Sequence, residues 1–174
     1  MRQSMWSLLL VACLPGPSAA ADYQPLAFLV GHCWKGTLPG GKQTDEHCFS
    51  SIYGGKFLRD RHTLHTVGRA DSFGESIYFW NSIAKQIEYL YIESDGGYSQ
   101  GAVSTDEVAL VFPPANYVED GKTQTYRSRW QRSGETNYDV VTEFQGKDGW
   151  VPGFKVHMER QGVSDVGGRP GGAE

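Results

Sequence analysis

The sequence has no cluster of basic residues. Its 174 residues include 16 Lys and Arg against 20 Asp and Glu, which gives a formal net charge of -4 at pH 7. Proteins that bind nucleic acid neutralise several phosphates with clustered lysine and arginine side chains. The composition therefore argues against that class, and we expect no nucleic-acid partner.

Long helix-forming segments are also missing after residue 22, where Gly, Pro and Asn-rich turn motifs interrupt the chain at short intervals. Between these turns lie short runs rich in β-branched and aromatic residues, a pattern typical of strands. Many consecutive short strands with tight turns favour an antiparallel barrel or sandwich, so the expected fold is all-β. We predict about ten strands, at residues 27–36, 42–52, 56–66, 74–80, 85–93, 98–103, 108–112, 123–132, 137–145 and 154–160.

The first residues have the features of an export signal. A single basic residue, Arg2, precedes an apolar run that is too short to span a bilayer, and small residues follow a Pro-Gly-Pro break. We expect a signal peptide over 1–21 and a mature protein that is periplasmic or secreted. Leu10-Val11-Ala12-Cys13 also resembles a lipobox, which would make Cys13 a lipid anchor, but the small-residue cleavage site favours simple export. One β-domain is expected over 22–161, with a disordered Gly-rich tail over 162–174.

Cysteine is scarce, and after removal of the signal peptide only two remain. Cys33 and Cys48 lie almost symmetrically about Pro39-Gly40-Gly41, a motif typical of a hairpin turn. A two-residue loop would set Cys33 opposite Cys48, whereas a three-residue loop would set Trp34 opposite Glu46; a bulge would reconcile the two. An even pair of cysteines in an oxidising compartment favours the disulfide.

Motifs for catalysis are missing too. The segment 97–101 matches Gly-x-Ser-x-Gly, but that motif needs a strand-to-helix turn, and here it lies in a predicted hairpin. We predict no catalytic residue and lean towards a protein that is not an enzyme. A scattered acid–base pair, such as Glu46 with a tyrosine, is the enzymatic alternative.

The five histidines offer no evident metal site in the sequence. His32 and His47 each precede a cysteine, and adjacent strand residues point to opposite faces. His62 and His65 are three apart, which also places them on opposite faces of a strand. We therefore expect that no two histidines share a metal-binding face, and we predict no metal ion.

Charged residues on successive strands are the best candidates for an interior polar site. Glu46, Arg61 and Glu75 could neighbour one another inside a barrel, where a buried charge must be paired. A structural ion pair or a solvated row of charges is the alternative interpretation. Aromatic residues make up 13% of the chain and would supply the apolar wall of such a site. The predicted ligand-binding residues are Trp34, Glu46, Arg61, Glu75, Tyr89, Tyr91, Tyr126 and Trp130.

Several of these residues give the chain a family resemblance. The segment Leu29 to Gly36, LVGHCWKG, resembles the Gly-x-Trp start of the calycins, the lipocalin-like barrels. With Glu46, Gly54-Gly55, Arg61 and Glu75, it is similar to small exported bacterial lipocalin-like families, whose relatives include the haem-binding barrel nitrobindin. The departure is that two residues, instead of one, separate Gly31 from Trp34. The resemblance implies an up-and-down barrel of about ten strands.

The resemblance to nitrobindin also singles out His157, because the haem-ligating histidine of that barrel lies on its last strand. Alternation places His157 on the face of Lys155 and Glu159, opposite an apolar face. We expect no cofactor, with haem as the minority alternative.

The expected function is non-enzymatic binding of a small, partly apolar ligand inside an exported barrel. The alternatives are a haem-binding nitrobindin-like barrel and a structural or interaction module of the cell envelope.

Overall fold

The computed structural model describes residues 23–162. The expected signal peptide, the anchor cysteine Cys13 and residues 163–174 of the expected tail lie outside this range. Within it, no helix has both the length and the apolar composition that a membrane span requires.

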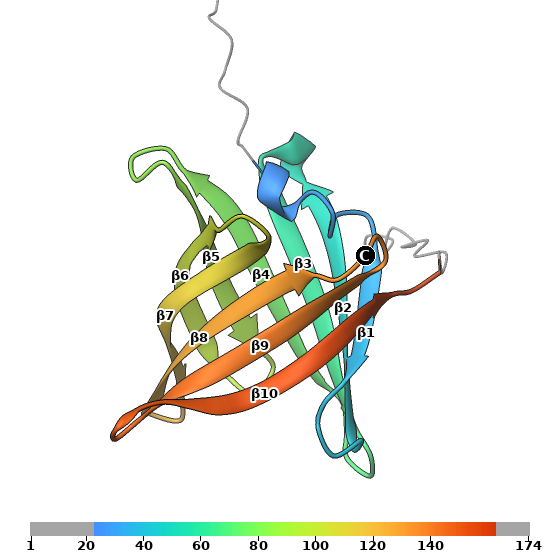
Figure 1. The fold of residues 1–174 in the computed structure, drawn as a ribbon, viewed down its shortest axis with the longest axis vertical. Helices are drawn as coiled ribbons and strands as arrows, with labels where there is room; N and C mark the ends of the chain where they lie inside the picture. Colours follow the sequence, from blue (N-terminus) through green and yellow to red (C-terminus); the bar gives the residue numbers. More distant parts are fainter. Residues whose placement is uncertain (1–22, 163–174) are drawn as a thin grey trace, which may run out of the picture.

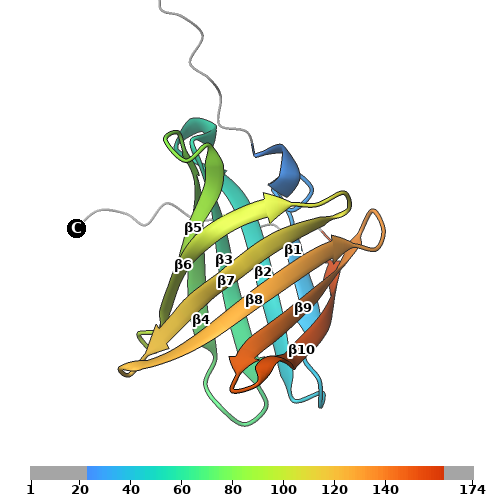
Figure 2. The same ribbon diagram turned by 60° about the vertical axis from the view of Figure 1, so that its left-hand side comes forward.

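The ten strands form one closed antiparallel barrel in which each strand pairs with its neighbours in sequence and β1 pairs with β10 (Figures 1 and 2). The predicted all-β, ten-stranded, up-and-down fold is confirmed. The strands are β1 (Cys33–Thr37), β2 (Gln43–Ile52), β3 (Phe57–Thr66), β4 (Ser72–Asn81), β5 (Gln86–Glu93), β6 (Tyr98–Thr105), β7 (Ala109–Glu119), β8 (Lys122–Arg132), β9 (Asn137–Gly146) and β10 (Gly149–Arg160).

The hairpin between β1 and β2 has the register in which Cys33 lies opposite Cys48. The two residues form a disulfide, with Cα atoms 4.0 Å apart. The loop is wider than two residues, because the amide of Leu38 still donates to the carbonyl of Gln43 (2.9 Å). Trp34 lies opposite His47, so the alternative register with Trp34 opposite Glu46 is wrong.

The segment before β1, residues 23–32, closes one end of the barrel as a plug. Residues 27–32 were expected to begin the first strand, but the chain forms a short 3-10 turn, η1 (Gln24–Leu26), followed by further turns up to Gly31. Leu26 and Leu29 are fully buried, and the amide of Gly31 donates to the carbonyl of Phe49 (2.9 Å). Burial of these two apolar side chains at the end of the barrel overrides the strand-like pattern.

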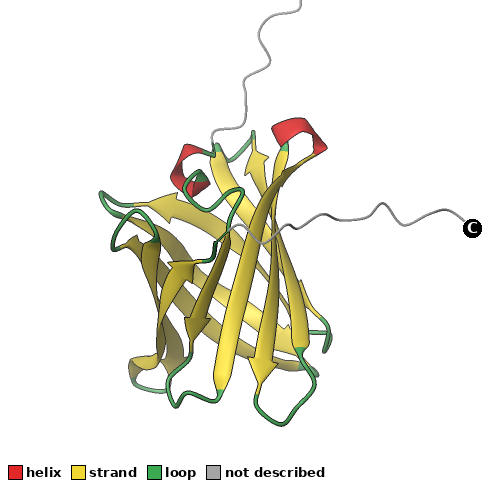
Figure 3. Ribbon diagram, turned by 90° about the vertical axis from the view of Figure 1, so that its right-hand side faces the viewer, coloured by secondary structure: helices red, strands yellow, loops and turns green. Residues whose placement is uncertain are grey.

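Figure 3 shows η1 and the second 3-10 turn, η2 (Tyr53–Gly55), at the same end of the barrel. The phenol of Tyr23 connects the plug to this end: it donates to the carbonyl of Lys56 (2.7 Å) and accepts from the amide of Trp80 (3.1 Å). The turns that connect β1–β2, β3–β4, β5–β6, β7–β8 and β9–β10 lie at the other end of the barrel.

Strand β7 continues through Pro113 and Pro114, where the prediction ended it. The pairing with β8 shifts by one residue between Phe112 and Ala115, so the two prolines lie in a β-bulge. Proline has no amide hydrogen for a ladder, and a bulge is one of the few places where a strand accommodates it.

Candidate functional site

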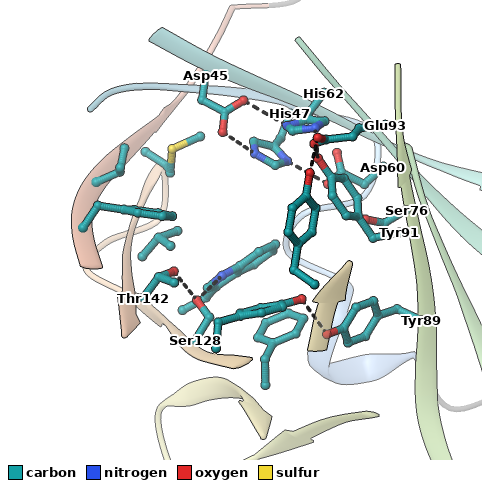
Figure 4. Close-up of a pocket in the computed structure, with 18 of the residues that line it drawn as sticks. Asp45, His47, Asp60, His62, Ser76, Tyr89, Tyr91, Glu93, Ser128 and Thr142 are labelled. Atoms are coloured by element: carbon teal, nitrogen blue, oxygen red, sulfur yellow. Dashed lines mark hydrogen bonds and ion pairs between the residues drawn. The ribbon is translucent and has the colours of Figure 1, made fainter. Parts of the chain in front are cut away.

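The barrel encloses a cavity of about 360 Å³ (Figure 4). Side chains that alternate along β2 to β5 and β7 to β10 point into it, as the period of two requires. The lining is mostly aromatic and aliphatic, with the acidic and histidine side chains on β2, β3 and β5. The lining residues are Asp45, His47, Asp60, His62, Ser76, Tyr78, Tyr89, Tyr91, Glu93, Phe112, Tyr117, Gln124, Tyr126, Ser128, Trp130, Tyr138, Val140, Thr142, Phe144, Phe154, Val156 and Met158.

One wall of the cavity is built from aromatic side chains held by hydrogen bonds. The phenol of Tyr126 contacts the phenol of Tyr89 (2.9 Å) and the hydroxyl of Ser99 (3.0 Å). Trp130 stacks on Tyr138, with ring centroids 5.7 Å apart. These contacts fix the orientation of large side chains around an apolar space.

A polar chain begins at His47, whose two ring nitrogens each face a carboxylate. Nδ1 lies 2.7 Å from Oδ2 of Asp60, and Nε2 lies 3.1 Å from Oδ2 of Asp45. A carboxylate only accepts hydrogen bonds, so both nitrogens of His47 donate and the ring is an imidazolium. Asp60 is only 3% exposed, and its second oxygen, Oδ1, has no hydrogen-bond partner among residues 23–162.

The chain continues from Asp45 along the inner wall. Its Oδ1 lies 3.1 Å from Nδ1 of His62, and Nε2 of His62 lies 2.8 Å from the phenol oxygen of Tyr91. Tyr91 donates to Oε2 of Glu93 (2.7 Å), and Tyr117 donates to Oε1 of the same carboxylate. Seven side chains from four strands thus form one continuous hydrogen-bonded network (Figure 4).

The charges of this network shift the pKa values of its members. Burial disfavours the charged ring of His47, but the carboxylates of Asp60 and Asp45 outweigh burial and raise the pKa of His47 well above its usual value. Burial likewise opposes ionisation of Asp45, but His47 and His62 hold the pKa of this carboxyl well below its usual value. Burial and the neighbouring Glu93 raise the pKa of Tyr91 above its usual value, which keeps the phenol neutral.

A glycine on β4 makes room for the network. Gly74 lies opposite His62 on β3, and a Cβ atom there would lie 2.0 Å from Nε2 of His62 and 2.9 Å from Cε2 of Tyr91. The substitution Gly74→Ala forces the imidazole to move and breaks its contact with Tyr91. We expect the free energy of unfolding to fall by about 1–3 kcal/mol, as overpacking of an interior does. Urea unfolding followed by tryptophan fluorescence measures the loss.

Gly134→Ala is the matched control, because the nearest atom to a Cβ there is Nδ2 of Asn137 at 3.6 Å. We expect this variant to stay within about 1 kcal/mol of the native protein. An equally small change in Gly74→Ala would show that His62 is not confined against β4.

The structure brings four of the predicted ligand-binding residues to the cavity: Tyr89, Tyr91, Tyr126 and Trp130. Trp34 is also inside, but it lies in the packed core next to the plug instead of in the cavity lining. Its Nε1 donates to the carbonyl of Leu29 (3.2 Å).

Glu46, Arg61 and Glu75 lie on the outside of the barrel, which corrects their expected placement inside. Strand alternation puts Glu46 on the face opposite to His47, and cross-strand pairing puts Arg61 directly opposite Glu75. The side chain of Glu46 is 42% exposed and lies 3.9 Å from the ammonium of Lys35. These three residues line a separate outer depression, so they do not form the polar end of the cavity.

His157 lies on the outer face of β10, as its alternation with Lys155 and Glu159 indicates. Its imidazole is 48% exposed, and Nδ1 contacts Oδ1 of Asp139 at 2.7 Å. It therefore does not reach the cavity, and the inner face of β10 carries Phe154, Val156 and Met158 instead.

The sequence analysis missed the pairing of two histidines across strands. His47 on β2 lies directly opposite His62 on β3, with ring centroids 4.9 Å apart. The expectation that no two histidines share a face is therefore wrong. The signal was present as two Asp-x-His motifs, at 45–47 and 60–62, whose histidines are equally distant from the centre of the Gly54-Gly55 turn.

Comparison with known proteins adds no family to this description. A scan against protein-family models finds no match to the chain, and a search of curated proteins finds no significantly similar sequence.

Proposed function

We propose that the barrel binds a small, partly apolar molecule in its cavity and acts as a binding protein instead of an enzyme. The supporting observation is the cavity of about 360 Å³, which lies within the range of roughly 300–1,000 Å³ for small-molecule sites. An apolar wall with a few oriented polar groups is the usual composition of such sites. The apolar part of the ligand would contact Trp130 and Tyr126, and its polar part would contact the network at His62 and Tyr91.

The proposal includes a lipocalin-like role outside the cytoplasm, in the periplasm or beyond. The Cys33–Cys48 disulfide is compatible with an oxidising compartment. The calycin-like start of the barrel and the signal-like residues 1–21 support the same interpretation.

Two alternatives receive less support. An envelope module without a ligand would be expected to fill its barrel with side chains, and a cavity of this size favours a ligand instead. A nitrobindin-like haem protein would need an axial ligand on the cavity wall, where His157 does not lie. The absorption spectrum of the purified protein tests haem binding directly, because bound haem absorbs visible light strongly.

The experiment measures binding of N-phenyl-1-naphthylamine, a neutral apolar probe whose fluorescence rises in an apolar site. Val140 lines the cavity, whereas its neighbour Val141 points outwards and is 39% exposed. We expect the native protein to bind the probe and Val140→Trp to bind it at least about tenfold more weakly, because the indole fills the cavity. The matched variant Val141→Trp should bind as the native protein does.

Equal affinities of the two valine variants, or no enhancement with the native protein, would contradict the proposal. The absorption spectrum and the native mass of the purified protein complete the test. Extra mass that is lost on denaturation identifies a co-purified ligand, and a haem spectrum would replace the proposed function with the nitrobindin-like one.

A further inference from the structure

We propose that Asp45, His47 and His62 form a binding site for a divalent transition-metal ion of the zinc class. Each residue offers one ligand atom, and these atoms all lie within 4.8 Å of one another. Asp45 and His47 alternate along the inner face of β2, and His62 lies directly opposite His47 on β3. Two neighbouring strands therefore fix all three ligands on one wall of the cavity.

The spacing suits tetrahedral coordination. Bonds of about 2.0–2.2 Å from zinc to nitrogen or oxygen place the ligand atoms of a tetrahedron about 3.3 Å apart. Nε2 of His47 and Nδ1 of His62 each lie 3.1 Å from an oxygen of Asp45. An ion would take the place of the hydrogen atoms that now lie in these two contacts, and the displaced protons, one from Nε2 of His47 and one from Nδ1 of His62, would leave to solvent.

Both imidazoles are oriented by a second hydrogen bond, as metal-binding histidines usually are. Nδ1 of His47 donates to Asp60 (2.7 Å), which leaves Nε2 to bind the ion. Nε2 of His62 donates to the phenol oxygen of Tyr91 (2.8 Å), because the hydroxyl hydrogen of Tyr91 is already donated to Glu93. This leaves Nδ1 of His62 as the ligand atom, so in both rings the nitrogen that faces Asp45 is the one that would bind the ion once its proton has left.

The charge of the cavity favours a cation independently of this geometry. Three carboxylates line it, those of Asp45, Asp60 and Glu93, and no lysine or arginine is among the described residues of the lining. Asp60 is almost completely buried in the cavity wall, and its Oδ1 has no partner in the part of the chain that the structure describes. A buried carboxylate oxygen without a partner indicates that another group completes the site.

The ligand set also indicates the kind of ion. Two imidazoles with one carboxylate suit zinc and neighbouring transition metals, whereas calcium and magnesium prefer sites made of oxygen atoms. All three ligands line the cavity, so a remaining coordination position is reached from inside it. The other group with suitable spacing among residues 23–162, Cys33, Glu46 and Cys48, lacks free thiolates because its cysteines form the disulfide.

The test is isothermal titration calorimetry, in which zinc sulfate is titrated into the untagged protein after EDTA has removed any metal and has itself been removed. We expect one zinc ion per chain for the native protein and an affinity at least about tenfold lower for His62→Gln. His65→Gln is the matched control on the same strand, because His65 is exposed on the outer face and contacts Asp71. It should bind zinc as the native protein does. No zinc binding by the native protein, or equal binding by His62→Gln, would overturn the proposal.

A second variant covers the case in which His62→Gln does not fold. Tyr91→Phe keeps all three ligands and removes only the oxygen that orients His62, and we expect a loss of affinity of about tenfold or more. Cobalt gives a spectroscopic readout: visible absorption of the tetrahedral ion should appear with the native protein and weaken with Tyr91→Phe. Unchanged cobalt spectra and zinc affinities in this variant would contradict the assigned geometry.

The metal site goes beyond the proposed function, and the two are tested separately. The naphthylamine titration is made in EDTA, so probe binding without zinc binding would remove only the metal site. Zinc binding without probe binding would remove only the ligand proposal.

Discussion

Replacement of Trp34 by alanine is expected to lower the free energy of unfolding by about 3–5 kcal/mol, the usual cost of deleting a buried tryptophan. Trp34 is only 1% exposed, and its ring packs edge-on against Tyr138 (5.1 Å between centroids) and Phe28 (6.1 Å). The variant also leaves the carbonyl of Leu29 without the indole donor. Guanidinium unfolding of the native and variant proteins measures the difference.

Trp150→Ala is the control for loss of an indole. Trp150 is only partly buried on β10, where the guanidinium of Arg127 lies 4.4 Å from its ring. A contact of this kind at an exposed site contributes about 0.5–1 kcal/mol, so the loss should be much smaller than for Trp34. If Trp34→Ala instead unfolds as the native protein does and loses only probe binding, then Trp34 is a ligand contact and not a core residue.

The free energy of unfolding is expected to fall steeply with rising pH above neutrality in the metal-free protein. The pKa of His47 is raised in the folded state from its ordinary value of 6.5, mainly by Asp60 and Asp45 acting against burial. The stabilisation is therefore complete below about pH 6.5 and is lost as pH rises through the folded-state pKa. One proton per molecule gives a slope of about -1.4 kcal/mol per pH unit over this range.

At acid pH the free energy of unfolding is expected to change with pH in the opposite direction, rising as pH rises. The pKa of Asp45 is lowered in the folded state from 3.8, so the stabilisation by its carboxylate is present above about pH 4 and is lost as pH falls further.

Urea unfolding in EDTA between pH 5 and 9 checks the alkaline decline in the free energy of unfolding, and His47→Gln should reduce the slope of that decline. His157→Gln is the control, because His157 is half-exposed on the outer face. Equal slopes for the two variants would show that the network does not hold His47 protonated.

The first hairpin of the barrel and its disulfide can be predicted from the sequence by counting residues outwards from the turn. Cys33 and Cys48 lie at equal distances from the centre of the Gly40-Gly41 turn, and the structure pairs them. The same counting about Gly54-Gly55 places His47 opposite His62, so two of the three candidate metal ligands can be predicted from the sequence in the same way. Alternation along β5 and β8 is equally regular, and Tyr89, Tyr91, Tyr126 and Trp130 line the cavity as expected.

The interior placement of Glu46 could not be decided in the same way. Residues 44–47, Thr-Asp-Glu-His, are polar at every position, so the apolar pattern that normally identifies the inner face of a strand is missing there. The inner face is set by a network that reaches β5 and β7 through Glu93 and Tyr117. No local pattern in β2 contains that information. The plug was not predicted for a related reason. Leu26 and Leu29 belong to a short apolar segment, and short apolar segments are also typical of strands.

The seam between β1 and β10 has a consequence for how the chain folds. Nine of the ten strand pairings join neighbours in sequence, whereas Trp34 and Arg160 meet across almost the whole described chain. The register there has three residue pairs, against five between β1 and β2. Contacts between distant residues form slowly because a long loop must close first. Successive hairpins can therefore form a curved open sheet before its two edges join. The inward-facing carboxylates and histidines would stay hydrated until that final closure, so the cost of removing them from water falls on the last step of folding.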